Sequence, residues 1–274
     1  MLVSVIVPTY KDVQALELIL DALKLQTYKN FEVIVAEDND SEEVKSFLKN
    51  YSSDYKIKHF FHADDGYQKP KALNSAIRLS DGDYLIFFDG DCLPYSNFVE
   101  VHVKNADKNL VLCGRRVNLG DDLSSDLRAK RIFVQDLEHH FFQYYFKMKK
   151  DGARHVECGM KVISSLKLHK VLKSKTALIG CNFSLHKEQM LKVNGFDESY
   201  PKNTTLADDV DLEWRLKYIG MEVKSVKYTA QLLHLNHPRA NRVSNNKFNL
   251  EQMSKKQENN NYFCEDGVVK KAVE

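Results

Sequence analysis

The chain has 274 residues, 43% of them hydrophobic and 28% charged, a composition typical of a globular protein with an ample core. A formal net charge of +2 is too close to neutral to indicate a nucleic-acid partner. The 5 cysteines are widely spread and form no Cys-x-x-Cys pair, so the sequence predicts reduced thiols rather than a disulfide framework or a zinc site.

In the first hundred residues, short apolar runs alternate with segments of helical periodicity. The apolar runs predict strands at Leu2–Val7, Phe31–Ala36, Ile57–Phe61 and Tyr84–Phe88. The segments between them predict helices over Val13–Leu23, from the N-cap Ser41 to about Tyr51, and from Pro70 onward with Leu73, Ala76 and Ile77 facing inward. Repeated β-α units of this length predict an α/β, Rossmann-like, mostly parallel sheet with helices on both faces.

The second half is less regular and predicts a smaller mixed region. Strands are expected at Val111–Cys113, Leu178–Leu185, Val223–Val226 and Gln231–Leu235. Helices are expected over Lys187–Val193 and Asp209–Ile219, the second closed by Gly220. Beyond Arg239 the composition turns polar, which predicts a tail that is partly disordered or folds over the site.

A basic region separates the two halves, with 12 Lys/Arg against 4 Asp/Glu between Arg128 and Lys175. It carries an apolar helical stripe made of Phe133, Leu137, Phe141, Tyr144 and Met148. Two interpretations remain open for it: a solvated face over a core stripe, or a surface for an acidic acceptor or anionic lipid head groups. No apolar run reaches 18 residues, so we expect neither signal peptide nor spanning helix, and a cytoplasmic protein, with peripheral contact at the inner membrane face as the alternative.

The most informative segment is Asp89-Gly90-Asp91, which follows a buried strand. Ligands bind at the carboxyl edge of open α/β sheets, and two carboxylates on a tight turn suit Mg²⁺ or Mn²⁺ carrying a diphosphate. Neither a Gly-x-Gly-x-x-Gly pattern nor a Walker-A lysine loop follows the first strand. The pattern therefore argues against an NAD enzyme and a P-loop ATPase.

Several motifs in matching order resemble the GT-A-fold family 2 glycosyltransferases. They are Val3–Tyr10, Val33–Asp38, the Asp-Gly-Asp turn, Gly180–Ser184, Gly195–Glu198, Ala207–Leu216 and His234–Arg239. The last four of these segments, from Gly180–Ser184 onward, also resemble a galactosyltransferase-like carboxyl half. The resemblance implies a nucleotide-sugar-binding half over 1–115, a basic and aromatic helical insertion over 116–176, an acceptor-binding and catalytic half over 177–240, and a polar tail over 241–274.

For the nucleotide, the resemblance implies that Pro8, Thr9 and Tyr10 line the pocket and that Asp38 binds the uracil edge. Glu37 stands where the family more often has aspartate, so the division of work between Glu37 and Asp38 stays open. A basic residue near the nucleotide is Lys69 or Lys71, with Lys71 slightly favoured. In the turn that contains Gly90, Asp89 reaches the ribose, or the metal through water.

For the cation, the resemblance implies that Asp91 holds Mn²⁺ or Mg²⁺ and that His237 completes the shell, with His234 as the second candidate. Imidazole beside carboxylate favours Mn²⁺. Asp209 aligns with the catalytic base, and Asp208 replaces the family's usual glutamate. Asn182 and Gly180 are expected to border the sugar or acceptor. Asp211 and Arg215, one helical turn apart, predict a structural ion pair.

The resemblance thus implies an inverting, metal-dependent hexosyltransferase. It would move galactose, glucose or an N-acetylated analogue from a UDP-sugar to a saccharide or lipid-linked saccharide acceptor during cell-surface polysaccharide synthesis. A sugar-1-phosphate nucleotidyltransferase would need a glycine-rich loop after the first strand, which Pro8-Thr9-Tyr10 does not supply. A non-catalytic sugar-nucleotide-binding subunit is the second alternative, and the intact acidic residues argue against it.

Overall fold

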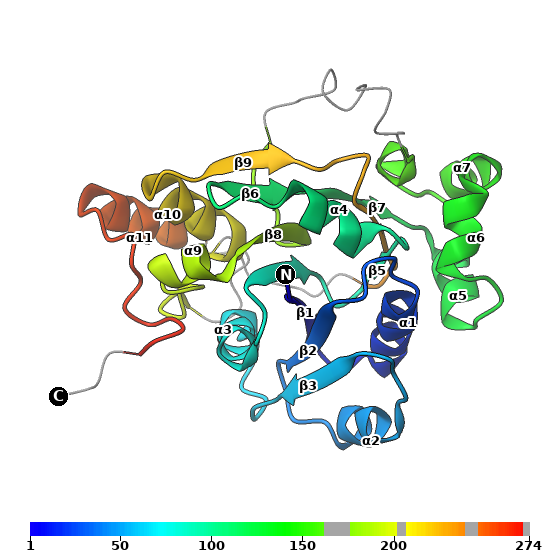
Figure 1. Cartoon of the computed structure of the whole chain (residues 1–274), viewed down its shortest axis with the longest axis horizontal. Coiled ribbons are helices and arrows are strands. Elements are labelled where there is room, and N and C mark those ends of the chain that lie inside the picture. The colour runs from blue at the N-terminus through cyan, green and yellow to red at the C-terminus, as the bar shows by residue number, and fades with distance from the viewer. Residues whose placement is uncertain (162–175, 202–206, 239–245, 271–274) are drawn as a thin grey trace.

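A central sheet organises the molecule in the computed structural model, which describes residues 1–161, 176–201, 207–238 and 246–270 (Figure 1). Within these residues, the seven strands of the sheet lie in the order β3-β2-β1-β4-β8-β6-β9. Their bounds are β1 Val3–Thr9, β2 Phe31–Glu37, β3 Lys56–Phe60, β4 Tyr84–Phe88, β6 Leu110–Cys113, β8 Asn182–His186 and β9 Glu222–Ser225.

The first four strands are parallel, as the repeated β-α units predict, and β6 and β9 are also parallel to each other. Strand β8 runs antiparallel to both of its neighbours, and its first residue, Asn182, pairs with Phe88 at the end of β4. The start of β8 therefore lies at the same edge as the carboxyl ends of β1, β2 and β4. The expectation of a mostly parallel α/β sheet is confirmed.

Helices cover both faces of this sheet (Figure 1). Their bounds are α1 Val13–Lys24, α2 Glu42–Asn50, α3 Lys69–Leu79, α4 Phe98–Asn105, α5 Asp121–Arg128, α6 Val134–His139, α7 Phe141–Lys150, α9 Lys187–Lys192, α10 Leu212–Tyr218 and α11 Asn246–Glu258. Alternate residues of a strand face opposite sides. On β1, Val5 therefore packs with α1 and α4 in one core, whereas Ile6 packs with α3, α9 and α10 in the other.

A second, three-stranded sheet is built from connections that leave the central one. Strand β10 (Gln231–His234) pairs antiparallel with β5 (Cys92–Pro94) and parallel with β7 (Arg115–Asn118). Because β5 begins directly after Asp91, this pairing brings His234 opposite Cys92. The small sheet thus carries a distant part of the chain to the Asp-Gly-Asp turn.

The element boundaries differ from the sequence expectations in several places, and the strand expected from Leu178 begins only at Asn182. Strand β1 continues through Pro8 to Thr9, because β1–β4 pairing ends at Ile6 and a residue without an N–H is tolerated beyond it. The apolar stripe is divided between α6 and α7 at His140, where the backbone turns to φ −114 and ψ 34. The helix expected from Asp209 begins as a π-helical turn, Ala207–Asp211, and α10 follows it.

The carboxyl tail differs most from expectation, because its described part is ordered. Helix α11 is followed by a segment that places the Val268 carbonyl 2.8 Å from the Arg78 guanidinium. Arg78 is in the last turn of α3, whereas Lys69 begins that helix at the site edge. The segment around Val268 therefore packs at the end of α3 opposite to Lys69. Within the described ranges, no helix has the length and apolar character needed to cross a bilayer.

Candidate functional site

The Asp-Gly-Asp turn lies directly against the end of β1. The Asp89 carbonyl accepts a hydrogen bond of 3.0 Å from the Cys92 amide, which closes the turn. A Cβ on Gly90 would lie 1.9 Å from the Pro8 carbonyl oxygen, closer than any side chain can approach. Glycine is therefore needed here for close packing of two backbones, and the two aspartates are held at the strand ends.

Asp91 is in contact with two histidines from the end of β10. Its Oδ2 lies 3.0 Å from His237 Nε2 and 3.2 Å from His234 Nε2. The Leu235 amide donates a 2.9 Å hydrogen bond to the Asp91 carbonyl, which fixes the register of the two segments. Burial alone would raise the pKa of Asp91, but the hydrogen bonds from His234 and His237 hold it far below its usual value. The hydrogen bond to Asp91 in turn raises the pKa of His237.

The same three residues fit a divalent cation. One ligand atom of each of Asp91, His234 and His237 lies within 4.8 Å of the others. A carboxylate oxygen with two imidazole nitrogens is a donor set suited to borderline ions such as Mn²⁺. Sequence reasoning ranked His237 before His234, and the structure brings both to the aspartate.

Asp89, in contrast, forms ion pairs with two basic side chains. Lys69 Nζ lies 2.7 Å from Oδ1 and an Arg116 guanidinium nitrogen lies 2.6 Å from Oδ2. Burial would raise the pKa of Asp89, and the charges of Lys69 and Arg116 keep it lowered. Lys69, rather than the slightly favoured Lys71, is the lysine that reaches the turn. Arg116 was missed, because nothing in the sequence indicates which residue of the Arg115-Arg116 pair on β7 faces the site.

At the end of β2, the two neighbouring acids differ in their surroundings. Glu37 is fully buried and is satisfied internally by His59, at 2.7 Å, and by the Ser41 amide, at 2.9 Å. Asp38 accepts a 2.9 Å hydrogen bond from the Gln68 amide, and burial raises its pKa. Glu37 thus supports the strand end, and Asp38 is also paired, with His62 Nε2 3.1 Å from its Oδ1.

The end of β1 contributes Thr9 and Tyr10 to the same edge. The Thr9 hydroxyl is buried and has no hydrogen-bond partner among the described residues. The Tyr10 side chain is 49% exposed, and its hydroxyl lies 3.3 Å from Asp64. The Thr9 hydroxyl and the exposed Tyr10 ring are therefore both available to a ligand at this edge.

Asp209 lies in the π-helical turn that precedes α10, against Gly180 before β8. A Cβ on Gly180 would lie 2.4 Å from Asp209 Oδ1, so a side chain there would displace the carboxylate. Burial and then the charge of Asp89 raise the pKa of the Cys181 thiol, and Asp209 acts in the same direction. Asp89 and Asp209 are thus both near one thiol. The side chain of Asp208 lies outside the described part.

Asn182 serves the fold rather than a ligand. Its side chain is fully buried, and its amide nitrogen donates to the carbonyls of Arg115, at 3.2 Å, and Ala230, at 3.0 Å. Its Oδ1 lies 3.1 Å from His102 Nε2. With all its polar atoms used, Asn182 joins β8 to β7 and to the start of β10. The expectation that it borders the sugar is not supported by these contacts.

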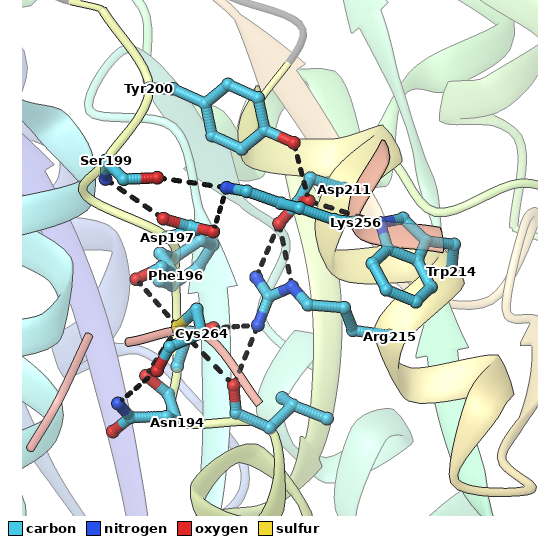
Figure 2. A network of polar contacts seen from close by, with 12 residues as sticks. Asn194, Phe196, Asp197, Ser199, Tyr200, Asp211, Trp214, Arg215, Lys256 and Cys264 are labelled. Atoms are coloured by element: carbon cyan, nitrogen blue, oxygen red, sulfur yellow. Dashed lines mark hydrogen bonds and ion pairs between the residues drawn. The ribbon is translucent and has the colours of Figure 1, made fainter. Parts of the chain in front are cut away.

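A buried polar network anchors α10 (Figure 2). Arg215 Nε lies 2.7 Å from Asp211, and its Nη1 donates 2.8 Å hydrogen bonds to the carbonyls of Val193 and Gly195. Asp211 is 1% exposed and Arg215 0%, so the expected structural ion pair is confirmed and is fully buried. The helix that follows Asp209 is therefore tied to the Gly195–Glu198 segment.

A cavity of about 330 Å³ opens beside the two histidines. It is lined by Arg116, Asn118, Leu119, Gly120, Asp121, Asp151, Gly152, Arg154, His234, Asn236 and His237. Most of these groups are polar. The cavity therefore extends the site from the Asp91 cluster toward the segment that follows α7.

The comparisons with known proteins agree with this arrangement. The chain is 34% identical over 111 residues to an uncharacterised glycosyltransferase of Rickettsia bellii, which covers 39% of this chain and 15% of the relative. The chain thus spans about a sixth of the length of the curated relatives that it matches first.

Two solved structures share the fold. A mannosyltransferase, PcManGT from Pyrobaculum calidifontis, in complex with GDP-Man and Mn²⁺, superposes with TM-score 0.57 and 18% identity, over 87% of this chain and 58% of that one. TarS 1–349 of S. aureus, in complex with UDP-GlcNAc, gives 0.54 and 16%, over 88% and 60%. The chain has the GT-A fold that these neighbours represent.

Two family profiles cover most of the chain. The profile described as N-terminal domain of galactosyltransferase matches residues 160–238. The profile of glycosyl transferase family 2 matches residues 4–172, which is more than half of the chain. The fold and the position of the Asp-Gly-Asp turn agree with this match. This chain is therefore a member of glycosyl transferase family 2.

Proposed function

We propose that the chain catalyses inverting, metal-dependent transfer of a hexose from a UDP-sugar to a saccharide or lipid-linked saccharide acceptor, in cell-surface polysaccharide synthesis. The observation that carries the proposal is the cluster of Asp91, His234 and His237, whose ligand atoms lie within 4.8 Å of one another at the carboxyl edge of the sheet. Two solved structures with the same fold, one in complex with GDP-Man and Mn²⁺ and one in complex with UDP-GlcNAc, support it.

The nucleotide would lie across the ends of β1 and β2. Pro8, Thr9 and Tyr10 would border the uridine, and the Asp38 carboxylate would accept from the uracil edge. Lys69 and Arg116, both held by Asp89, bring two positive charges beside the Asp91 cluster. These cations would bind the diphosphate, whose charge grows as the sugar leaves. Asp89 would orient them and reach toward the ribose.

The cation would be Mn²⁺ or Mg²⁺ bound by Asp91, His237 and His234, with Asp89 close by. It would neutralise charge on the departing diphosphate. Asp209, with Asp208 beside it, would act as general base. As the acceptor oxygen bonds to the anomeric carbon, its proton passes to the Asp209 carboxylate, and the breaking carbon–oxygen bond leaves its electron pair on UDP.

The test combines binding and turnover with matched variants. Mn²⁺ binding by calorimetry should weaken strongly in His237→Ala and Asp91→Asn, whereas Asp209→Asn should bind Mn²⁺ and UDP normally and lose transfer. Asp54→Asn, which changes an exposed aspartate in the loop between α2 and β3, is the control. Transfer at wild-type rates by both Asp91→Asn and Asp209→Asn would overturn the proposal.

The same assay separates the alternatives. Nucleotide-sugar binding without UDP release, with water or with a panel of sugar acceptors, would indicate a non-catalytic binding subunit. Release of pyrophosphate from UTP and a sugar 1-phosphate would indicate a nucleotidyltransferase. A thermal-shift panel of nucleotide-sugars with Mn²⁺ would identify the sugar, because a tight ligand raises Tm by mass action.

A further inference from the structure

Helix α7 exposes two aromatic rings on a face that no other element covers among the described residues. Phe142 is 75% exposed and Phe146 is 76% exposed, the largest fractions of any large hydrophobic residue of that part of the chain. They are four residues apart, so they lie one above the other on the helix. The opposite face, with Phe141 and Met148, is buried in the core. The helix is therefore anchored on one side and open on the other.

The charges on the open face are all positive. At 100° per residue, Lys149 and Lys150 fall on the same side as Phe142 and Phe146, and α7 contains neither aspartate nor glutamate. Neither lysine forms an ion pair with a described residue, whereas Lys147, nearer the core side, pairs with Asp126 at 3.2 Å. Exposed rings flanked by lysines without an acidic partner in the described part of the chain are typical of a helix that lies in the plane of an anionic bilayer.

The exposed face of α7 lies close to the cavity beside His234 and His237. The helix ends at Lys150, and Asp151, Gly152 and Arg154 directly after it form one wall of the cavity that His234 and His237 border. With a rise of 1.5 Å per residue, Phe146 lies roughly 10 Å along the chain from that wall. A polar head group held at the bilayer surface under α7 would therefore be close to the cavity.

We propose that the exposed face of α7, formed by Phe142, Phe146, Lys149 and Lys150, docks on an anionic phospholipid bilayer and presents a lipid-linked acceptor to the cavity beside His237. The part about the acceptor rests on the proposed function, whereas the docking itself does not. The lipid tail stays in the membrane, and the saccharide head enters the polar cavity. The exposed Arg154 guanidinium stands at the wall where a phosphate of the head group would pass.

Vesicle cosedimentation tests the docking. The wild-type chain should bind vesicles of phosphatidylglycerol and phosphatidylethanolamine at low salt, bind phosphatidylcholine vesicles much more weakly, and lose binding as salt rises. Lys149→Glu/Lys150→Glu should weaken binding roughly 30-fold or more, because each basic residue contributes about 1 kcal/mol near such a surface. Phe142→Ser/Phe146→Ser should weaken it by at least about tenfold.

Two controls keep these outcomes interpretable. Phe248→Ser removes an exposed phenylalanine on α11, away from the proposed face, and should bind vesicles as the wild type does. Because the rings on α7 are three-quarters exposed, Phe142→Ser/Phe146→Ser should keep its Tm and its rate with a soluble acceptor, and lose rate only with a vesicle-embedded acceptor.

Several results would overturn the docking: no binding of the wild type to anionic vesicles at low salt, wild-type binding by both α7 variants, or a concentration-dependent dimer that disappears in Phe142→Ser/Phe146→Ser. The last result would make the face an interface between two copies. Vesicle binding without any sugar transfer would instead contradict the proposed function and support the membrane docking of α7. Transfer to a soluble acceptor without vesicle binding would support the proposed function and contradict the membrane docking of α7.

Discussion

Acidification should destabilise the protein through one buried histidine. His102 is fully buried, and burial lowers its pKa to about 4, with a hydrogen bond to Asn182 opposing part of that shift. An unfolded chain would give the same imidazole a pKa of about 6.5. Below that value the unfolded state binds a proton that the native state resists, so stability falls as the pH falls.

The hydrogen bonds show why the native imidazole must stay neutral. Asn182 uses its amide nitrogen on two carbonyls, so its Oδ1 faces His102 and Nε2 must carry the hydrogen. Nδ1 lies 2.7 Å from the Ser184 hydroxyl and must accept from it, and Ser184 in turn accepts from Tyr84, also at 2.7 Å. A second proton on Nδ1 would oppose the serine hydrogen and leave a charge in the core.

The magnitude follows from the two pKa values. With about 4 in the native state and about 6.5 in the unfolded state, the free energy of unfolding should drop by about 2 kcal/mol between pH 7 and pH 5 through His102 alone. By pH 4 the free energy of unfolding should have fallen by about 3 kcal/mol through this residue. Above pH 6.5 the neutral His102 should make its full contribution to stability.

Urea unfolding followed by circular dichroism at pH 7, 6 and 5 measures this loss. His102→Gln should be less stable at pH 7, because it loses the contact with Ser184, but should show a smaller decrease on acidification than the wild type. His139→Gln, at an exposed histidine on α6, should keep the wild-type decrease. If His102→Gln loses as much stability between pH 7 and pH 5 as the wild type, the reasoning is refuted.

Three further substitutions test the packing and charge of the site. Gly90→Ala should weaken Mn²⁺ binding at least about tenfold in calorimetry, because its Cβ would collide with the β1 backbone and displace the turn. Arg215→Met should lower the free energy of unfolding by about 3–5 kcal/mol in urea, since it leaves a buried charge, and adding Asp211→Leu should recover much of that loss. Arg116→Gln should lower kcat at least as much as it raises KM for the UDP-sugar, because it removes a positive charge, now paired with Asp89, that would stabilise the diphosphate as its charge grows.

Each of these has a result that would count against it. Unchanged Mn²⁺ affinity in Gly90→Ala would mean that the turn can move without the ligands. A double variant of Asp211 and Arg215 less stable than Arg215→Met would assign the loss to packing rather than to the unpaired charge. An unchanged kcat in Arg116→Gln would show that Arg116 does not stabilise the departing diphosphate.

The sequence by itself determined the elements and the ends of strands on which the site is built. Strand and helix periodicity placed Tyr84–Phe88 and the N-cap Ser41 correctly, because burial on both sheet faces and capping leave local signatures. The turn at Asp89–Asp91 and the ion pair of Asp211 with Arg215 were likewise readable, since their partners are close along the chain.

Only the tertiary structure decided which distant side chains meet. Lys69 and Arg116 converge on Asp89 because α3 begins, and β7 runs, beside the end of β4, and no local pattern distinguishes them from Lys71 and Arg115. Asn182 belongs to the core for the same reason: its partners come from three other segments of the chain. Periodicity and capping depend on residues close along the chain, so they can be predicted from the sequence. Contacts across the sheet depend on strand order and register, which no local pattern encodes.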